Sequence, residues 1–308
     1  ALLLLAAAAA GSAYAVAHRL LAGRLALART TLRQIRKRRF ENLEAVRPAH
    51  GDELNDLIWQ VYRTGQAHEK EIRELKRLEN YRREFLGNVS HELKTPIFAI
   101  RGFAETLLGG ALDDEQVNRA FVEKIVRNAD RLGNLTRDLA EVSRIEMGEL
   151  EMARAPFALA PLVREVAESL EPLATAKQIA LGVQVPPDLP AVFGDRERIR
   201  QVLINLIDNA VKYNSAGGHV EVVARHAAEG LVKVSVVDDG IGIAPEHLPR
   251  LTERFFRVDT SRSRSQGGTG LGLAIVKHLL SAHGSRLVVE SLPGKGSTFG
   301  FALPVAGG

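Results

Sequence analysis

Hydrophobic side chains between residues 85 and 142 recur at helical spacing in two stretches. In the first, they fall on one stripe roughly 80° wide when each residue is rotated by about 100°. Its members are Leu86, Val89, Leu93, Ile97, Ile100, Ala104 and Leu107. The second stripe follows a turn at 109–114 and contains Val117, Phe121, Ile125, Leu132, Leu135, Leu139 and Val142. Two amphipathic helices joined by a short turn predict an antiparallel hairpin, and because one hairpin cannot bury both stripes well, we expect a homodimer with a four-helix bundle.

Beyond residue 150 the pattern changes to short apolar and alternating runs that are typical of strands. The predicted strands are 157–159, 179–183, 219–224, 231–237, 286–290 and 298–303. Helices are expected over 161–174, 196–213 and 271–283. This order predicts a mixed sheet with its helices on one face, so the fold class is α plus α/β, a helical hairpin followed by a sandwich.

The first residues, Ala1–Ala17, are uncharged and rich in Leu and Ala, and eight Lys or Arg residues with no acid lie between Arg19 and Arg39. This apolar run is at the short limit for crossing a bilayer, and 20–23 can extend it while Arg19 snorkels. We therefore predict a transmembrane helix over 1–23 with its C-terminal side in the cytoplasm. A signal-peptide core is the alternative, although no basic region precedes it. A nucleic-acid-binding arm is disfavoured because no aromatic residues interrupt the basic run.

Residues 24–79 are polar and helical in character, with a break at Pro48 and Gly51. Apolar side chains recur at helical spacing among Glu, Lys and Arg, which predicts a cytoplasmic helical connector that enters the next helix without interruption. The run Gly51–Leu54 resembles the connector end of a HAMP signalling module. The predicted domains are a membrane helix at 1–23, this connector at 24–79, the hairpin at 80–150 and the sandwich at 151–308.

Composition narrows the possible chemistry. The 308 residues include no Cys, which excludes disulfides, thiolate nucleophiles and Cys-ligated metals. Nine His residues are present, but no pair has ligand-like spacing with a supporting third group. We therefore expect no metal site built on histidine.

One histidine is distinguished by its position. His91 lies opposite the first apolar stripe, with Glu92 beside it and Thr95 one helical turn later. An exposed imidazole next to a carboxylate suits general-base chemistry or metal binding, and it can also have no role. Pro96 removes one backbone hydrogen bond and can bend the helix there.

The predicted helix over 196–213 carries polar side chains on a face about 60° wide. They are Asn205, Asn209 and Lys212, with Tyr213 just beyond. Amide oxygens are suitable ligands for Mg²⁺, which bridges phosphates, and a Lys can pair with a phosphate. A solvated helix face is the alternative interpretation of this motif taken alone.

Two glycine-containing turns follow. Asp238 ends a predicted strand before Gly240 and Gly242, where a carboxylate can accept a hydrogen bond from an adenine amino group and the glycines admit the base. The loop 267–272 precedes a helix, so its amides predict an anion cradle for a triphosphate. An ordinary turn and a hairpin loop are the alternatives for these two motifs. Between them, the Ser/Arg-rich segment 258–266, which follows Arg-Phe-Phe-Arg at 254–257, predicts a nucleotide lid.

Six motifs in this order resemble the sensor histidine kinases of bacterial two-component systems over about residues 80–305. The sequence around His91 is most similar to phosphate-regulon-type sensors, although Phe98 stands where that family often has a small polar residue. The motifs are His-Glu-x-x-Thr-Pro at 91–96, Asn-x3-Asn-x2-Lys-Tyr at 205–213, Asp-x-Gly-x-Gly at 238–242, Arg-Phe-Phe-Arg at 254–257, Gly-x-Gly-x-Gly-Leu at 268–273 and Gly-x-Gly-Ser-Thr-Phe at 294–299.

The resemblance implies a dimerization and phosphoacceptor hairpin followed by a Bergerat-type ATP-binding sandwich. By position it makes His91 the phosphoacceptor, Glu92 its proton partner and Thr95 the residue that holds a water for a phosphatase reaction. It implies that Asn205 and Asn209 hold Mg²⁺. The implied ATP-binding residues are Asn209, Lys212, Tyr213, Asp238, Gly240, Gly242, Arg257, Gly268, Thr269, Gly270, Leu271 and Gly272.

The resemblance therefore implies ATP-dependent autophosphorylation of His91, transfer to an Asp of a separate response regulator, and phosphatase activity toward that regulator. The expected setting is the inner (cytoplasmic) membrane of a bacterium, with a homodimer whose catalytic part is cytoplasmic and which binds no nucleic acid. One alternative is an ATP-binding scaffold that does not phosphorylate, which the intact motifs disfavour. Another is a nucleotide-driven clamp ATPase, which leaves the His-bearing hairpin unexplained.

Overall fold

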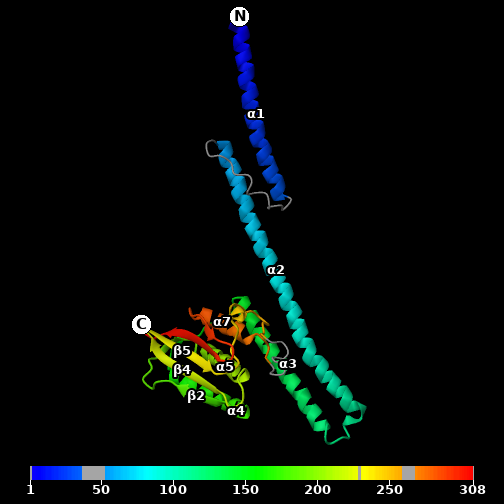
Figure 1. Ribbon diagram of the computed structural model, residues 1–308, viewed down its shortest axis with the longest axis vertical. Coiled ribbons are helices and arrows are strands. Elements are labelled where there is room, and N and C mark those ends of the chain that lie inside the picture. The colour runs from blue at the N-terminus through cyan, green and yellow to red at the C-terminus, as the bar shows by residue number, and fades with distance from the viewer. Residues whose placement is uncertain (1, 37–52, 228–229, 259–267, 308) are drawn as a thin grey trace. The chain divides into compact units, whose positions relative to one another are not determined.

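The computed structural model describes residues 2–36, 53–227, 230–258 and 268–307. It divides into two compact units, Ala1–Gly87 and Asn88–Gly308. The first holds helix α1 (Leu2–Arg36) and the N-terminal part of helix α2 (Glu53–Thr106). The second holds the remainder of α2, helix α3 (Asn118–Glu146) and the sandwich (Figure 1).

Helix α1 is long and apolar enough to cross a membrane. Its 35 residues include an 18-residue window of mean hydropathy 1.3, none of which is buried. Of the helices in the described ranges, no other meets this criterion. The helix continues past the predicted span to Arg36, and Arg33 and Arg36 in its last turn favourably oppose the helix dipole. The break predicted at Pro48 and Gly51 lies outside the described residues.

Helix α2 is uninterrupted through Pro96, which confirms a connector that runs directly into the His91 helix. A π-helical turn, η2 (Leu107–Ala111), then reverses the chain into α3. Gly110 in this turn has φ 120°, a conformation that favours glycine. The predicted helical hairpin is therefore confirmed.

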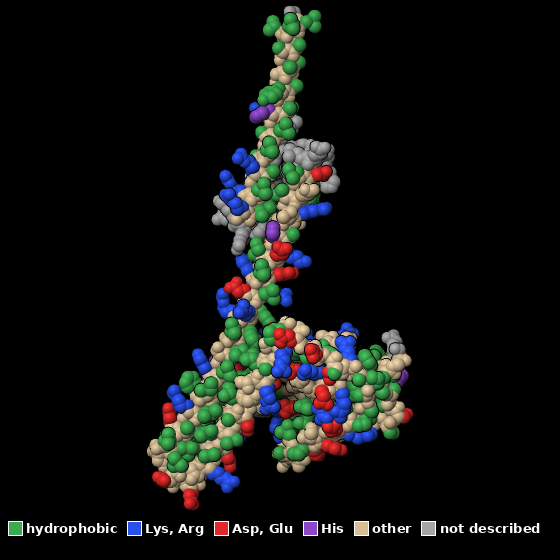
Figure 2. Space-filling view, turned by 180° about the vertical axis from the view of Figure 1, so that it is seen from behind, with side chains coloured by type: hydrophobic (Ala, Val, Ile, Leu, Met, Phe, Trp, Pro, Cys, Tyr) green, Lys and Arg blue, Asp and Glu red, His purple; other side chains and the backbone are tan. Residues whose placement is uncertain are grey.

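The hairpin buries only part of its apolar surface. Leu135 and Val142 of α3 are buried, whereas Leu86, Ile97 and Leu108 are between 48% and 81% exposed. Figure 2 shows hydrophobic side chains gathered along this hairpin. They form the surface that a second copy of the chain would be expected to cover.

The sandwich contains a five-stranded sheet of order β2-β4-β5-β7-β6. Strand β2 runs parallel to β4, and the other neighbours are antiparallel, which confirms the predicted mixed sheet. A separate two-stranded sheet consists of β1 (Ala155–Phe157) and β3 (Val192–Gly194). The predicted strand 157–159 overlaps β1 only at Phe157, and β3 was not predicted, because three residues are too few to show an alternating pattern. The large sheet consists of β2 (Ala180–Gln184), β4 (His219–Ala227), β5 (Leu231–Asp238), β6 (Val288–Ser291) and β7 (Ser297–Pro304).

The helices of the sandwich cover one face of the sheet. They are α4 (Leu159–Ala176), α5 (Arg196–Lys212) and α7 (Gly272–Ala282), and the 3-10 helix η4 (Pro245–Arg250) lies between β5 and α7 in the chain (Figure 1). In β5, Val232, Val234 and Val236 are fully buried while the residues between them are not, as expected for a sheet with one covered face. Helix α5 packs against β4, β5, α4 and α7, so it lies at the centre of the core.

Asp195 fixes the start of α5. Its Oδ1 accepts hydrogen bonds from the backbone N–H groups of Glu197 at 3.0 Å and Arg198 at 3.1 Å, and its Oδ2 accepts one from Ala153 at 2.9 Å. The side chain therefore caps the helix and ties the segment after the hairpin to it.

We expect Asp195→Ala to lower the free energy of unfolding by about 1–3 kcal/mol, because three backbone donors lose their acceptor. Urea unfolding of the detergent-solubilised chain, followed by circular dichroism, measures this change. The control is Asp188→Ala, at an exposed aspartate between β2 and β3, which should change stability by less than about 0.5 kcal/mol. Equal losses for the two variants would contradict the capping role.

Candidate functional site

Helix α5 supplies one wall of the candidate site. Leu203, Leu206 and Ile207 are fully buried on its core side, and this fixes the direction of the opposite face. Asn205 and Asn209 lie on that opposite face and are partly exposed, as predicted.

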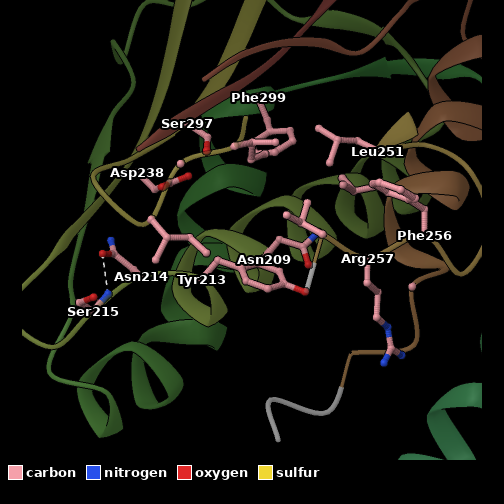
Figure 3. A pocket seen from close by; sticks show the side chains of 16 residues that line it. Asn209, Tyr213, Asn214, Ser215, Asp238, Leu251, Phe256, Arg257, Ser297 and Phe299 are labelled. Atoms are coloured by element: carbon pink, nitrogen blue, oxygen red, sulfur yellow. Dashed lines mark hydrogen bonds between the residues drawn. The ribbon is translucent and has the colours of Figure 1, made fainter. Parts of the chain in front are cut away.

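A cavity of about 460 Å³, the large cavity, lies beside α5 (Figure 3). Figure 3 shows Asp238 at one end and Arg257 at the other, with Asn209 and Tyr213 between them. The size and the mainly apolar lining with one buried carboxylate suit a planar heterocycle held by a single polar anchor. The lining residues are Asn209, Tyr213, Asn214, Ser215, Asp238, Ile241, Gly242, Ile243, Leu251, Phe256, Arg257, Val258, Gly270, Leu273, Ser297 and Phe299.

Asp238 is the buried carboxylate at the end of β5, with 8% of its surface exposed. Burial raises the pKa of Asp238, and hydrogen bonds from the backbone N–H groups of Gly240 and Ser297 partly offset that rise. The bond from Gly240 reaches Oδ1 at 2.9 Å. An acceptor held in this way is suited to bind a donor on the ring system of a ligand.

The turn after Asp238 requires glycine at Gly242. Its φ is 66°, and a Cβ there would lie 1.9 Å from the carbonyl oxygen of Leu292. The neighbouring Asp239 accepts hydrogen bonds from the Asn214 amide at 2.8 Å and the His219 N–H at 2.7 Å, and these bonds lower the pKa of its carboxyl. Asp239 therefore stabilises the turn through its hydrogen bonds, while Asp238 lines the large cavity.

The glycine loop before α7 closes the other side of the large cavity. Phe255 donates its N–H to the carbonyl of Gly270 at 2.8 Å, and the Arg257 guanidinium donates to the carbonyl of Gly268. The loop therefore lies against the Arg-Phe-Phe-Arg motif. Residues 259–267, most of the predicted lid, lie outside the described residues.

A second cavity of about 190 Å³, the polar cavity, lies on the far side of Asn209. Because Asn209 lines both cavities, the two meet at its side chain. Sequence reasoning missed the three residues that α3 contributes, since they lie on the polar side of an amphipathic helix and resemble a solvated face. The polar cavity is lined by Asn134, Arg137 and Asp138 of α3, Asn205, Asp208, Asn209 and Lys212 of α5, and Thr269 and Gly272 of the glycine loop.

His91 is exposed on α2 and does not line either of these two cavities. Thr95, one turn later, donates its hydroxyl to the His91 carbonyl at 3.2 Å. Glu92 Oε2 accepts hydrogen bonds from Arg131 of α3 at 3.0 Å and from Arg257 at 3.2 Å. Arg131 is a further partner that the sequence did not indicate, because its contact depends on how the two helices pack.

Among the described residues, four side-chain contacts join the hairpin to the sandwich, and in each the carboxylate belongs to the hairpin. The donors in the sandwich are three arginines and one threonine. The pairs are Glu92 with Arg257 at 3.2 Å, Asp138 with Thr269 at 2.7 Å, Glu141 with Arg198 at 2.7 Å, and Glu146 with Arg254.

The structure thus places the predicted residues in four groups. The large cavity takes Asn209, Tyr213, Asp238, Gly242, Arg257 and Gly270, and the polar cavity takes Asn205, Asn209, Lys212, Thr269 and Gly272. Gly240, Gly268 and Leu271 lie in the turns beside these cavities, and His91, Glu92 and Thr95 lie on α2.

Two family models match the chain. The His Kinase A (phospho-acceptor) domain matches residues 81–148, and the Histidine kinase-, DNA gyrase B-, and HSP90-like ATPase matches residues 194–307. The first covers the hairpin with His91, and the second covers both cavities except for the residues from α3. The second match implies that the domain formed by residues 194–307 binds ATP.

Curated relatives are themselves sensor proteins. The chain is 42% identical over 228 residues to the sensor-like histidine kinase SenX3 of Mycobacterium tuberculosis, covering 74% of this chain and 55% of the relative. It is 38% identical over 230 residues to the phosphate regulon sensor protein PhoR of Pseudomonas aeruginosa, covering 75% and 52%. The chain therefore spans about half the length of these curated relatives.

Solved structures give the same family. The histidine kinase AdeS of Acinetobacter baumannii superposes with a TM-score of 0.58 at 25% identity, over 70% of this chain and 98% of that one. The histidine kinase ThkA, in complex with the response regulator protein TrrA, superposes with a TM-score of 0.61 at 26% identity, over 78% and 66%. The chain belongs to the sensor histidine kinases, which confirms the predicted family and fold class.

We expect Asp238→Asn to weaken ATP binding by about 10-fold or more, because a hydrogen bond to a charged acceptor contributes about 1.5–3 kcal/mol. Calorimetric titration with ATP measures the dissociation constant. The control is Glu290→Gln, which removes an exposed carboxylate from β6 and should leave the constant unchanged. Unchanged affinity in Asp238→Asn would show that Asp238 does not anchor the base.

Proposed function

We propose that the protein is a membrane-anchored, ATP-dependent protein-histidine kinase that phosphorylates itself on His91 and passes the phosphoryl group to an Asp of a separate response regulator. The observation that carries this proposal is the pair of cavities joined at Asn209. One is shaped for a base beside Asp238 and the other is polar and suited to phosphates. The part of α2 that carries the exposed His91 belongs to the same compact unit as the cavities.

The proposed reaction is an in-line phosphoryl transfer. A neutral imidazole nitrogen of His91 attacks the γ-phosphorus, a new N–P bond forms, and the bond from that phosphorus to ADP breaks. Because there is little covalent work for the protein to do, its contribution is to position the reactants and neutralise charge. Lys212 and the amides at the start of α7 line the cavity in which this charge would lie.

Asn205 and Asn209 are proposed to hold Mg²⁺. Their amide groups line the polar cavity together with the Asp208 carboxylate, and hard oxygen donors of this kind fit the ion. When bound, Mg²⁺ would neutralise charge on the phosphates. Asn205 is kept in place by its own amide N–H, which donates to the Gln201 carbonyl at 3.0 Å.

Glu92 is the proposed proton partner of His91, its neighbour on α2. The guanidinium groups of Arg131 and Arg257 fix the position of its carboxylate, and both partners in each contact are at most 15% exposed. A carboxylate held in place beside an imidazole can orient the ring or accept its proton.

The setting of the kinase is proposed from three observations. Helix α1 and the basic residues after it support an anchor in a bacterial inner membrane with the catalytic part in the cytoplasm. The exposed apolar side chains of the hairpin support a homodimer. ThkA was solved with a response regulator protein, which supports a partner of that class. The predicted domains, 1–23, 24–79, 80–150 and 151–308, remain our proposed division, and we expect no nucleic-acid partner.

We expect His91→Gln to abolish the acid-labile phosphoryl label that forms when the solubilised chain is incubated with γ-labelled ATP, because no imidazole then lies at the phosphoacceptor position. Autoradiography before and after acid treatment measures the label. The control is His68→Gln, which removes an exposed imidazole from the same helix and should keep full labelling. A wild-type chain that binds ATP but takes no label would support a non-phosphorylating scaffold instead.

We expect Thr95→Ala to reduce dephosphorylation of the phosphorylated regulator at least about 10-fold while autophosphorylation changes less than about 3-fold, because a water loses its hydroxyl partner. Release of phosphate from the regulator measures the first rate. Thr106→Ala is a matched control, since this exposed hydroxyl likewise donates to the carbonyl four residues earlier on α2, at 2.8 Å. If Thr95→Ala dephosphorylates as fast as wild type, Thr95 does not hold the water.

A further inference from the structure

The carboxylate of Asp138 reaches from the hairpin into the polar cavity. It belongs to α3, whereas the cavity walls from α5 and the glycine loop belong to the sandwich. If a base occupies the large cavity at Asp238, its phosphates must pass Asn209 into the polar cavity, since the two meet there. This step rests on the proposed function, and it places the outer phosphates beside Asp138.

The contact between Asp138 and the loop is specific. Thr269 donates its hydroxyl to Asp138 Oδ2 at 2.7 Å, and the same hydroxyl oxygen accepts the Leu271 N–H at 3.2 Å. One threonine therefore links the hairpin carboxylate to the backbone from which α7 begins. In this arrangement the loop amide of Leu271 and the Thr269 hydroxyl already have partners.

Without a ligand, the charged side chains that line the polar cavity are two carboxylates and two cations. Lys212 Nζ pairs with Asp208 Oδ2 at 2.6 Å, and Arg137, which donates to Asn134 at 2.5 Å, lines the cavity as the second cation. Burial raises the pKa of Asp138, and the Thr269 hydrogen bond, Arg137 and Lys212 only partly offset that rise. The environment thus disfavours negative charge at Asp138 even before a phosphate enters.

We propose that Asp138 is a specificity-determining residue of the nucleotide site, whose carboxylate opposes the terminal phosphates so that hairpin docking on the glycine loop favours nucleoside diphosphate over triphosphate. The repulsion grows with the number of phosphates that reach the polar cavity. By linkage, a bound triphosphate weakens the Asp138–Thr269 contact by the same factor by which that contact weakens triphosphate binding.

The test compares Asp138→Asn with Glu141→Gln in the full chain held in detergent micelles with Mg²⁺. Asparagine keeps the size of the side chain and an oxygen that can accept the Thr269 hydrogen bond. Glu141 is one helical turn away, pairs with Arg198 of the sandwich at 2.7 Å and does not line the polar cavity. Both variants lose one hairpin carboxylate that contacts the sandwich, but only the first loses charge inside the cavity.

Calorimetry measures binding of a non-hydrolysable ATP analogue, ADP and adenosine to each variant. We expect Asp138→Asn to bind the triphosphate about 10-fold tighter and ADP about 3-fold tighter, with adenosine unchanged. Glu141→Gln should shift all three ligands by one common factor. Adenosine binding that is retained in both variants also shows that the sandwich of each variant is folded.

Two results would overturn the inference. Weaker triphosphate binding by Asp138→Asn would make Asp138 a ligand for the metal of the nucleotide, and an equal change for all three ligands would make it a docking contact without selectivity. A wild-type chain that binds none of the three contradicts the proposed function itself, so the two failures are distinct.

Hydrogen exchange gives an independent readout of the linkage. In the wild-type chain, the triphosphate analogue should speed amide exchange in α3 around 134–142 more than ADP does, because it opposes docking there. In Asp138→Asn this difference between the two nucleotides should disappear. An equal effect of both nucleotides on wild-type α3 would contradict the inference.

Discussion

The burial of one face of helix α5 is the constraint on which the rest of the sandwich depends. Leu203, Leu206 and Ile207 are fully removed from solvent against the sheet and its neighbouring helices. At about 25 cal/mol per Å² of apolar surface, rotating this face toward water would cost several kcal/mol, so the helix has one orientation. Packing of α5 in the core therefore fixes the position of Asn209 between the two cavities.

Arg257 connects the chemistry of the sandwich to that of the hairpin. It lines the large cavity, donates to the Gly268 carbonyl in the glycine loop and also pairs with Glu92, which is adjacent to His91 in the sequence. With 6% of its side chain exposed, a guanidinium in this position must keep polar partners on every side. The guanidinium of Arg257 therefore joins the glycine loop to the carboxylate that follows His91 in the sequence.

Sequence patterns predicted the parts of the fold and the site that are periodic. The alternation in β5 and the stripe on α5 identified the sheet and its central helix, and Asp238 was found because a carboxylate at a strand end is followed by glycines. The three-residue strand β3 was missed, since a period of two cannot show in so short a run. Arg131 and Asp138 were also missed: both lie on the polar side of α3, where only tertiary packing separates a solvated residue from one in a site.

The four contacts between hairpin and sandwich share one polarity, with acids on the hairpin and donors, mainly arginines, on the sandwich. Two hairpins brought together through this face would oppose carboxylates to carboxylates, and two sandwiches would oppose arginines to arginines. Because like charges placed opposite each other cost free energy, the acidic face of the hairpin disfavours a second hairpin and favours the sandwich. The arginine-bearing face of the sandwich likewise disfavours a second sandwich. Self-association is thereby left to the apolar side of the hairpin, and the charged side is available to the sandwich.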